Sequence, residues 1–253
     1  MRTAVLALWG GLLLSPYSAW PAQTSPVLAT ARRQVESADY RMNGRLVSVN
    51  ANGTRTTDRV RIKARWFPGV LWEQIAVTSP PAARVRLLLE MRPGGTSTIW
   101  IAHPGDKAPA VLAFAKWSQG PLGPAFSYED FLEGQYFWAG QKDLGVTKFG
   151  ARNCDELRST PGAADKTHFA AVKSCLDPQS GFPLHVEKTL KDAVTVKEFT
   201  YFGLHQTRGV WWAHQVEAKI RGRAGSTLLI IERGTPEAHL SLQDFNLARL
   251  THF

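Results

Sequence analysis

Few residues of this chain have the types and spacing that covalent catalysis needs. The sequence contains no Gly-x-Ser-x-Gly nucleophile turn, no phosphate-binding glycine loop, no Gly-x-Gly-x-x-Gly and no His-Glu-x-x-His. We therefore predict that the chain is not an enzyme and binds no cofactor and no metal. A hydrolase of lipid esters that lacks these motifs is a third alternative, after the two binding functions described below.

Two groups of titratable residues still require an interpretation. His205 and His214 flank the turn 207–209, where a metal or base role competes with exposed hairpin side chains. Glu129, Asp130 and Glu133 cluster near the start of an expected helix, and paired carboxylates can act as acid and base. At a helix N-terminus, however, such carboxylates are explained by the helix dipole, and we expect them to be solvated charges.

The two cysteines, Cys154 and Cys175, flank a polar stretch of the chain. In an oxidising compartment they are expected to form a disulfide. Two unrelated buried thiols are the alternative. A zinc site is disfavoured because only His168 lies between the cysteines and the spacing fits no zinc pattern.

The N-terminus has the build of a secretory signal peptide. Arg2 precedes an apolar run at 4–14, and small residues follow, so we predict a signal peptide over 1–22 with cleavage after Ala19 or Ala22. The run is shorter than the roughly 20 residues that span a bilayer. An uncleaved N-terminal anchor is the alternative. No cysteine follows the run to accept a lipid, so the exported chain is expected to be soluble and not lipid-anchored.

Composition narrows the possible partners. Thirty Lys and Arg against 21 Asp and Glu give a formal charge of +9, which suits an acidic partner or an anionic membrane surface. No basic helix and no aromatic RNA-binding signature is present, so nucleic acid is not expected. Nine tryptophans among 253 residues favour a broad apolar interior or a cavity over a small polar active site.

The pattern along the chain is that of strands. A helix is expected over 26–38, followed by a hairpin of 40–49 and 59–66 around an Asn-Gly turn. In its second arm apolar and basic side chains alternate. The basic face, which is either a wet outer face or a docking surface, consists of Arg59, Arg61, Lys63 and Arg65. Further strands are expected at 85–91, 97–102, 145–152, 170–176, 184–190, 194–202, 211–220 and 227–231.

The stretch 104–124 is rich in proline and glycine, and it leads to Ser127, which can cap a helix over 128–138 with Asp130 in a capping box. This helix is either an ordinary core element or a lid over a cleft, and the residues alone do not decide. About ten strands and three helical pieces, with no break in composition, predict a mainly β (α+β) fold. It would form one domain over 27–253 with a single curved antiparallel sheet.

Three stretches carry a resemblance to a known family. They are residues 99–104 (IWIAHP), 126–131 (FSYEDF) and 180–188 (SGFPLHVEK). They resemble the LolA and LolB periplasmic lipoprotein carriers, and most closely the branch of outer-membrane lipoprotein-sorting proteins. In element order the resemblance spans about 27–250, whereas these motifs cover only about 25 residues. The paired cysteines, the many tryptophans and the proline-rich loop depart from the central family members.

The resemblance implies an incomplete β-barrel with helices closing the concave side. It also implies a periplasmic, monomeric carrier of lipid or lipoprotein acyl chains, with an inner-membrane transporter or outer-membrane acceptor as partner. A periplasmic sensor or scaffold that uses the same fold without lipid transfer is the alternative. The expected cavity wall consists of Ile62, Ala64, Trp66, Leu87, Leu89, Met91 and Trp100. The expected lid consists of Phe126, Tyr128, Phe131 and Leu132.

Overall fold

The protein is described by a computed structural model that covers residues 25–94, 96–120, 122–123 and 125–253. The predicted signal peptide, 1–22, lies outside the described residues. In the part of the chain that is described, no helix is long and apolar enough to cross a membrane.

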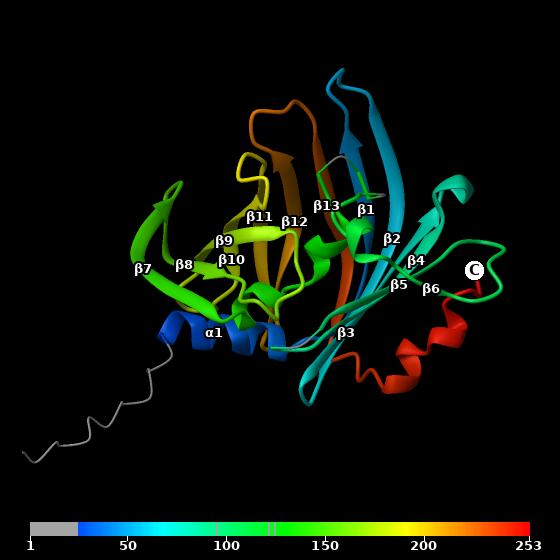
Figure 1. The fold of residues 1–253 in the computed structure, drawn as a ribbon, viewed down its shortest axis with the longest axis horizontal. Helices are drawn as coiled ribbons and strands as arrows, with labels where there is room; N and C mark the ends of the chain where they lie inside the picture. The colour runs from blue at the N-terminus through cyan, green and yellow to red at the C-terminus, as the bar shows by residue number, and fades with distance from the viewer. Residues whose placement is uncertain (1–24, 95, 121, 124) are drawn as a thin grey trace, which may run out of the picture.

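Thirteen strands form one antiparallel sheet, in the order β6-β5-β4-β3-β2-β1-β13-β12-β11-β10-β9-β8-β7. The strands are β1 (Asp39–Val49), β2 (Arg55–Phe67), β3 (Val70–Ser79), β4 (Val85–Met91), β5 (Thr98–Ala102), β6 (Ala110–Val111), β7 (Gly140–Phe149), β8 (Arg152–Thr160), β9 (Phe169–Leu176), β10 (Pro183–Leu190), β11 (Val196–Thr207), β12 (Val210–Ile220) and β13 (Ser226–Pro236). The sheet curves strongly but is not closed, because β6 and β7 are its two free edges (Figure 1). The predicted mainly β fold with one curved antiparallel sheet is confirmed.

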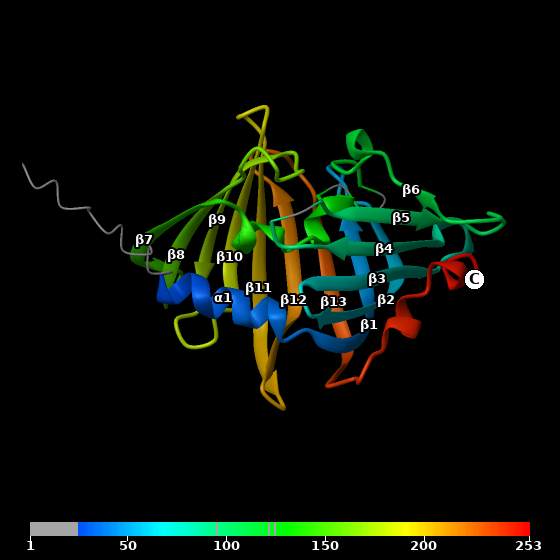
Figure 2. The same ribbon diagram turned by 60° about the horizontal axis from the view of Figure 1, so that its bottom comes forward.

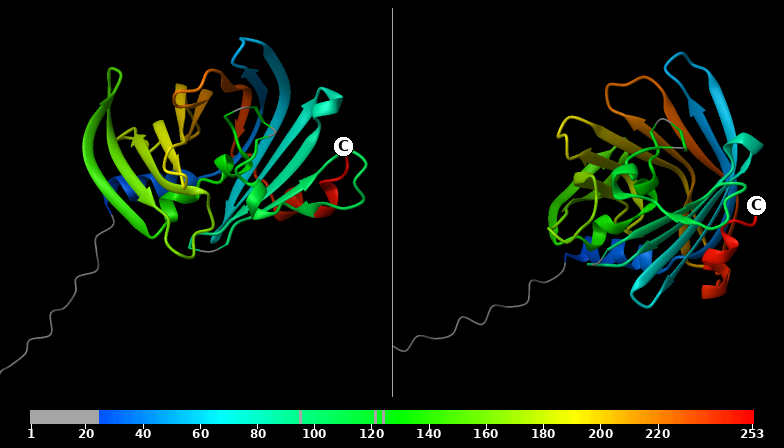
Figure 3. Two further views of the ribbon diagram at one scale, coloured as in Figure 1. Left: turned by 45° about the horizontal axis from the view of Figure 1, so that its top comes forward. Right: turned by 45° about the vertical axis from the view of Figure 1, so that its right-hand side comes forward.

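Period-two alternation gives the sheet an inner and an outer face. The inner face carries the main apolar core, with Leu46 on β1, Ile62 on β2, Leu87 on β4 and Phe199 on β11 among its buried members. The described chain between β6 and β7, residues 112–120, 122–123 and 125–138, lies within the curve (Figure 3), and we call it the mid-chain segment. Its buried residues belong to the same core, so the sheet is filled largely by its own chain.

Four strands, β3, β6, β7 and β8, were missed or misplaced in the prediction from the sequence. β3 lacks a clean alternation because most of its residues are buried, including Leu71 and Ala76 on opposite faces. The outer face of β3 is covered by the C-terminal segment, residues 237–253, whose Phe245 contacts Trp72. The strand expected at 145–152 instead spans the turn between β7 and β8, where Gly150 has a positive φ of 59°. β6 has only two residues and no pattern of its own.

The one α-helix in the described chain, α1 (Pro26–Glu36), connects the two ends of the sheet. It ends two residues earlier than predicted, and Val27, Leu28, Ala31 and Val35 form its buried face. That face packs with Ala64, Leu71 and Met91 from one end of the sheet and with Leu157 and Leu176 from the other. Figure 2 shows the helix crossing in front of the strands.

The turn between β9 and β10 comes so close to α1 that only glycine fits. A Cβ on Gly181 would lie 2.8 Å from the backbone carbon of Thr30 and 2.9 Å from the nitrogen of Ala31. Gly181 also has a φ of 69°, which side chains rarely adopt. This turn therefore holds its end of the sheet against the helix.

The prediction of one helix over 128–138 is wrong. The chain forms two short 3-10 helices, Tyr128–Phe131 and Gly134–Phe137, separated by Leu132 in an extended conformation. Gly134 is a poor helix former, and residues on several sides of this stretch are buried, which no single amphipathic face provides. Helices that close the concave side are therefore not confirmed. The remaining short helices are Pro81–Ala83, Phe114–Lys116, Leu242–Phe245 and Leu247–Arg249.

Cys154 on β8 and Cys175 on β9 form the predicted disulfide, with their Cα atoms 5.4 Å apart. The bridge is buried beside Leu184, so it also contributes to a small apolar cluster. It connects residues 21 apart in the sequence, on neighbouring strands.

We predict that the double variant Cys154→Ala/Cys175→Ala loses about 3 kcal/mol of unfolding free energy, because the open chain gains entropy when unfolded. Urea unfolding of the two proteins measures this. The wild type in reducing agent should show a similar loss, and equal stability of oxidised wild type and variant would contradict the prediction.

Candidate binding site

The structure contains an apolar cavity of about 160 Å³ between the inner face of the sheet, α1 and the mid-chain segment. Its walls come from β1, β2, β3, β11, β12 and β13, so strands far apart in the sequence meet around it. The lining residues are Ala31, Gln34, Val35, Ala38, Tyr40, Met42, Ile62, Leu71, Glu73, Phe126, Asp130, Phe131, Glu133, Tyr136, Gly181, Phe182, Pro183, Phe199, Tyr201, Trp211, Trp212, Ala213, Val216, Leu229 and Ile231.

Several residues that line the cavity are partly exposed where α1 approaches the β12–β13 pair. These strands pair over only four residues, 215–218 of β12, whereas β11 and β12 pair over ten. Beyond the paired stretch, Trp211 and Trp212 line the cavity and are partly exposed. Gln34 of α1 donates a hydrogen bond from Nε2 to the carbonyl oxygen of Trp211 at 3.2 Å. We call this partly exposed edge, formed by Gln34, Trp211, Trp212 and Val216, the mouth.

The predicted wall residues lie in three different places. Ile62 lines the cavity, whereas Leu87 and Leu89 are fully buried in the main core beside it. Ala64, Trp66 and Met91 pack in the cluster around α1. Trp100 is on the outer face, stacked on Trp72 with ring centroids 5.8 Å apart, because it alternates with the inward Ile99.

Of the predicted lid residues, Phe126 and Phe131 line the cavity. Their rings stack with centroids 5.4 Å apart, and Phe126 also contacts Phe199 edge to face. Tyr128 and Leu132 pack in the core without lining the cavity. Together with Tyr136, the rings of Phe126 and Phe131 are the aromatic side chains with which the described part of the mid-chain segment covers the cavity.

A buried ionic cluster fixes the mid-chain segment to the sheet. Ser127 donates from its backbone nitrogen (2.6 Å) and its Oγ (2.7 Å) to Oδ2 of Asp130, which forms the predicted capping box. The ammonium of Lys197 on β11 pairs with the same oxygen, and Lys188 on β10 donates to the Asp130 carbonyl at 3.0 Å and lies 3.4 Å from Oδ1. All four residues are buried, so the charge of Asp130 is compensated by the two lysines and not by solvent.

The prediction of solvated carboxylates at 129–130 is therefore wrong. Burial alone would raise the pKa of Asp130, but the charges of Lys197 and Lys188 outweigh it and hold that pKa below its usual value. The Glu129 carboxyl is also buried, and its Oε2 accepts from the backbone nitrogen of His168 at 3.2 Å. Burial raises the pKa of Glu129.

Two further carboxyls, Glu73 and Glu133, line the cavity. Burial raises the pKa of Glu73 well above its usual value, and the charge of Glu133 adds to this effect. The pKa of Glu133 is raised by burial as well. Glu73 lies on β3, the strand that the sequence pattern did not reveal, so no sequence signal pointed to it.

The predicted basic face lies on the outer side of the sheet and is partly occupied. Lys63 donates to the backbone oxygen of Asp244, and Arg65 donates to that of Leu240 and lies 3.6 Å from Asp39. The C-terminal segment thus uses two of the four basic residues. Arg61 lines an outer groove, whose charged lining residues are Arg41, Arg61, Lys63, Arg86, Arg249 and Asp244.

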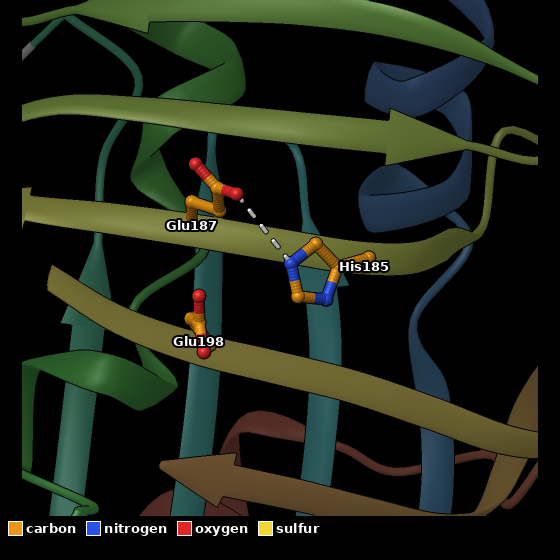
Figure 4. A group of neighbouring side chains, drawn as sticks. All are labelled: His185, Glu187 and Glu198. Atoms are coloured by element: carbon orange, nitrogen blue, oxygen red, sulfur yellow. Dashed lines mark ion pairs between the residues drawn. The ribbon is translucent and has the colours of Figure 1, made fainter. Parts of the chain in front are cut away.

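One group in the described residues has the composition of a metal site. His185, Glu187 and Glu198 place one ligand atom each within 4.8 Å of one another on β10 and β11 (Figure 4). Arg221 already pairs with both carboxylates, at 2.8 Å from Glu187 and 2.6 Å from Glu198. The group is therefore an ion-pair network on the sheet.

His205 and His214 do lie near each other on the β11–β12 hairpin, with ring centroids 6.4 Å apart. Both side chains are exposed, and His205 lies closer to Trp212, at 5.2 Å. This arrangement is that of surface hairpin residues.

Comparison with solved structures defines the class of fold. A putative outer membrane lipoprotein-sorting protein domain from Vibrio parahaemolyticus matches with a TM-score of 0.80 at 20% identity, over 89% of this chain and 97% of that one. A DUF1329 family protein from Desulfovibrio piger matches with a TM-score of 0.79 at 15% identity, over 88% and 97%. A LolA superfamily protein from Nitrosomonas europaea matches with a TM-score of 0.66 at 14% identity, over 87% and 96%. The fold is that of the LolA-like proteins, as the sequence motifs indicated.

A family model with the description "Uncharacterized protein" matches residues 73–252. This is more than half of the chain, and the chain belongs to that family. None of the curated proteins matches this chain.

We predict that Asp130→Asn destabilises the protein by about 3–5 kcal/mol, because it leaves Lys188 and Lys197 buried without a counter-charge. Chemical unfolding monitored by tryptophan fluorescence measures the loss. An effect below 1 kcal/mol would show that the cluster does not hold the segment.

Asp244→Asn is the matched control. Asp244 makes the same capping box with Ser241, but its ion pair to Arg41 is partly exposed. We expect a loss of about 1 kcal/mol from this variant, because exposed pairs contribute little.

We also predict that Glu73→Gln flattens the pH dependence of stability. A carboxyl whose folded pKa is raised favours folding below its unfolded pKa of about 4.3, and this contribution is lost as pH rises toward the folded value. The wild type should therefore lose stability between pH 4.5 and 8 relative to E73Q, as measured by urea unfolding. Parallel curves for the two proteins would contradict the raised pKa.

Proposed function

We propose that this protein binds and carries lipid or lipoprotein acyl chains in the periplasm, without catalysing a reaction. The observation that carries the proposal is the cavity between the curved sheet and the mid-chain segment, with its apolar and aromatic lining and its mouth. Each methylene group moved from water into such a lining stabilises the complex by about 0.8 kcal/mol. The likeness of the fold to lipoprotein-sorting and LolA superfamily structures supports the same function.

The size of the cavity limits what enters without rearrangement. An apolar cavity of about 150 Å³ accommodates a benzene ring. The present one, at about 160 Å³, therefore holds a short stretch of an acyl chain. A longer chain requires the walls to move. Breaking the buried Asp130 cluster would cost several kcal/mol, so we place the opening at the mouth, between α1, β12 and β13.

Transport places further demands on the chain. A signal peptide over 1–22 would deliver it to the periplasm, where the disulfide is stable. An inner-membrane transporter would load the carrier and an outer-membrane acceptor would receive the cargo. Release requires moderate affinity, which a small cavity and a partly exposed mouth favour.

A second candidate function is the docking of an acidic protein partner, as a sensor or scaffold. The observation that favours it is the outer groove, where five basic side chains face one carboxylate, Asp244. Two of the five, Lys63 and Arg86, also donate to backbone oxygens of the C-terminal segment. Arg41 and Arg61 are the residues to replace in a test of this function.

Val216→Trp tests the carrier. Val216 lies at the mouth and is half-buried, so a larger side chain can be accommodated there while narrowing the entrance. We expect the exported chain to bind a fluorescent fatty-acid ester with saturation, and the variant to bind it at least about tenfold more weakly. Titration followed by probe fluorescence measures both affinities.

Val194→Trp is the control, because Val194 is 85% exposed, lies in the turn between β10 and β11 and does not line the cavity. It should bind like the wild type. A wild type that never binds the probe, or a Val216→Trp variant that binds it normally, would refute the cavity as the binding site. Replacing Arg41 and Arg61 by Glu should leave this binding unchanged and abolish capture of an acidic partner.

A further inference from the structure

The cavity has a charge character that an acyl-chain site does not need. Its lining includes three carboxyl groups, those of Glu73, Asp130 and Glu133, and among the described residues no Lys, Arg or His lines it. Asp130 is compensated by its two lysines. Lys188, whose charge also acts on Glu133, is bonded to Asp130. Glu73 and Glu133 are the carboxyls that remain for a ligand.

Glu73 is a buried polar group without a partner in the described chain. Its residue is 7% exposed, and no hydrogen bond or ion pair to another described residue satisfies its carboxyl. A carboxyl that is buried without a partner costs free energy, and such a group in a native protein usually contacts a water or an ion or has a functional role. Because Glu73 lines the cavity, a ligand there would be its partner.

Aromatic rings form much of the remaining wall. Nine of the lining residues are aromatic: Tyr40, Phe126, Phe131, Tyr136, Phe182, Phe199, Tyr201, Trp211 and Trp212. The faces of such rings attract cations, and cages of aromatic side chains bind quaternary ammonium groups. Tyr40 lies close enough to both free carboxyls that their charges raise its pKa, after the larger effect of burial. Rings and carboxyls therefore line the same cavity.

We propose that the cavity selects amphiphiles that carry an organic ammonium group. The ammonium would pair with Glu73 and Glu133 and lie against the aromatic rings, and the alkyl chain would occupy the apolar remainder. This inference rests on the proposed function, since it names the class of ligand for the same site. The cavity of about 160 Å³ would hold an ammonium head with the first carbons of its chain, and the rest of a longer chain would extend through the mouth.

Charge explains the discrimination. An ammonium entering the site compensates the two carboxyls, which can then ionise, and attraction between unlike charges is strong where water is excluded. A sulfate head would lose its hydration without gaining an ion pair, and its negative charge would oppose ionisation of the two carboxyls. A neutral head gains only the contacts of its alkyl chain.

The test compares three ligands with the same alkyl chain: decyltrimethylammonium, decyl sulfate and decanol, each below its micelle concentration or solubility limit. Calorimetric titration of the full exported chain measures their affinities. The same titrations of Val216→Trp measure binding to the basic surface, and this contribution is subtracted from the binding of the wild type. We expect the ammonium ligand to bind at least about tenfold more tightly than the sulfate.

The double variant Glu73→Gln/Glu133→Gln separates charge from shape. We expect it to lose at least tenfold in affinity for the ammonium ligand and to bind decanol within twofold of the wild type, which also shows that the cavity is intact. Glu237→Gln, which changes an exposed carboxyl outside the cavity, should behave like the wild type.

Two outcomes overturn the inference alone: equal affinity of the wild type for the ammonium and sulfate ligands, or an unchanged preference in the double variant. If none of the three ligands binds, the proposed function and this inference both fail.

Discussion

The buried contact of Asp130 with Lys188 and Lys197 is the interaction on which the arrangement of this protein depends. It joins the mid-chain segment to β10 and β11 and leaves no charge of its own facing solvent. Because a buried charge without its partner is so costly, the segment has one position inside the curve. The rings of Phe126 and Phe131, which cover the cavity, are placed by that anchor. The same anchor makes this segment a fixed wall.

The outer face of the curved sheet is covered at one end and exposed at the other. At the β2–β5 end, the C-terminal segment covers the outer face, so both faces are buried there. At the β7–β12 end, the outer face carries exposed ion pairs such as the Glu187–Arg221–Glu198 network. α1 connects these two ends across the open side of the sheet. The cavity remains because the chain fills the inner face only in part.

Much of the fold could be predicted from the sequence, but less of the site. Strands with one wet face, such as β2, show alternation and were recognised, whereas β3 is buried on both faces and shows none. The motif at 126–131 correctly marked the capping box of Ser127 and Asp130, but its charges were expected in solvent because Lys188 and Lys197 are some 60 residues away in the sequence. Alternation alone also did not show which face of β5 is the inner one, so Trp100 was expected on the cavity wall. Long-range packing decides each of these points.

The short seam between β12 and β13 has a mechanical consequence. Hydrogen bonds over four residues resist shear far less than the ten-residue ladder beside them. Bending of the whole sheet will therefore concentrate between β12 and β13, and the part of the sheet on each side of this pair will move as a rigid body. Since α1 packs against both parts of the sheet, a force on the helix would change the distance between them. A protein that binds α1 would thus change the volume enclosed by the sheet.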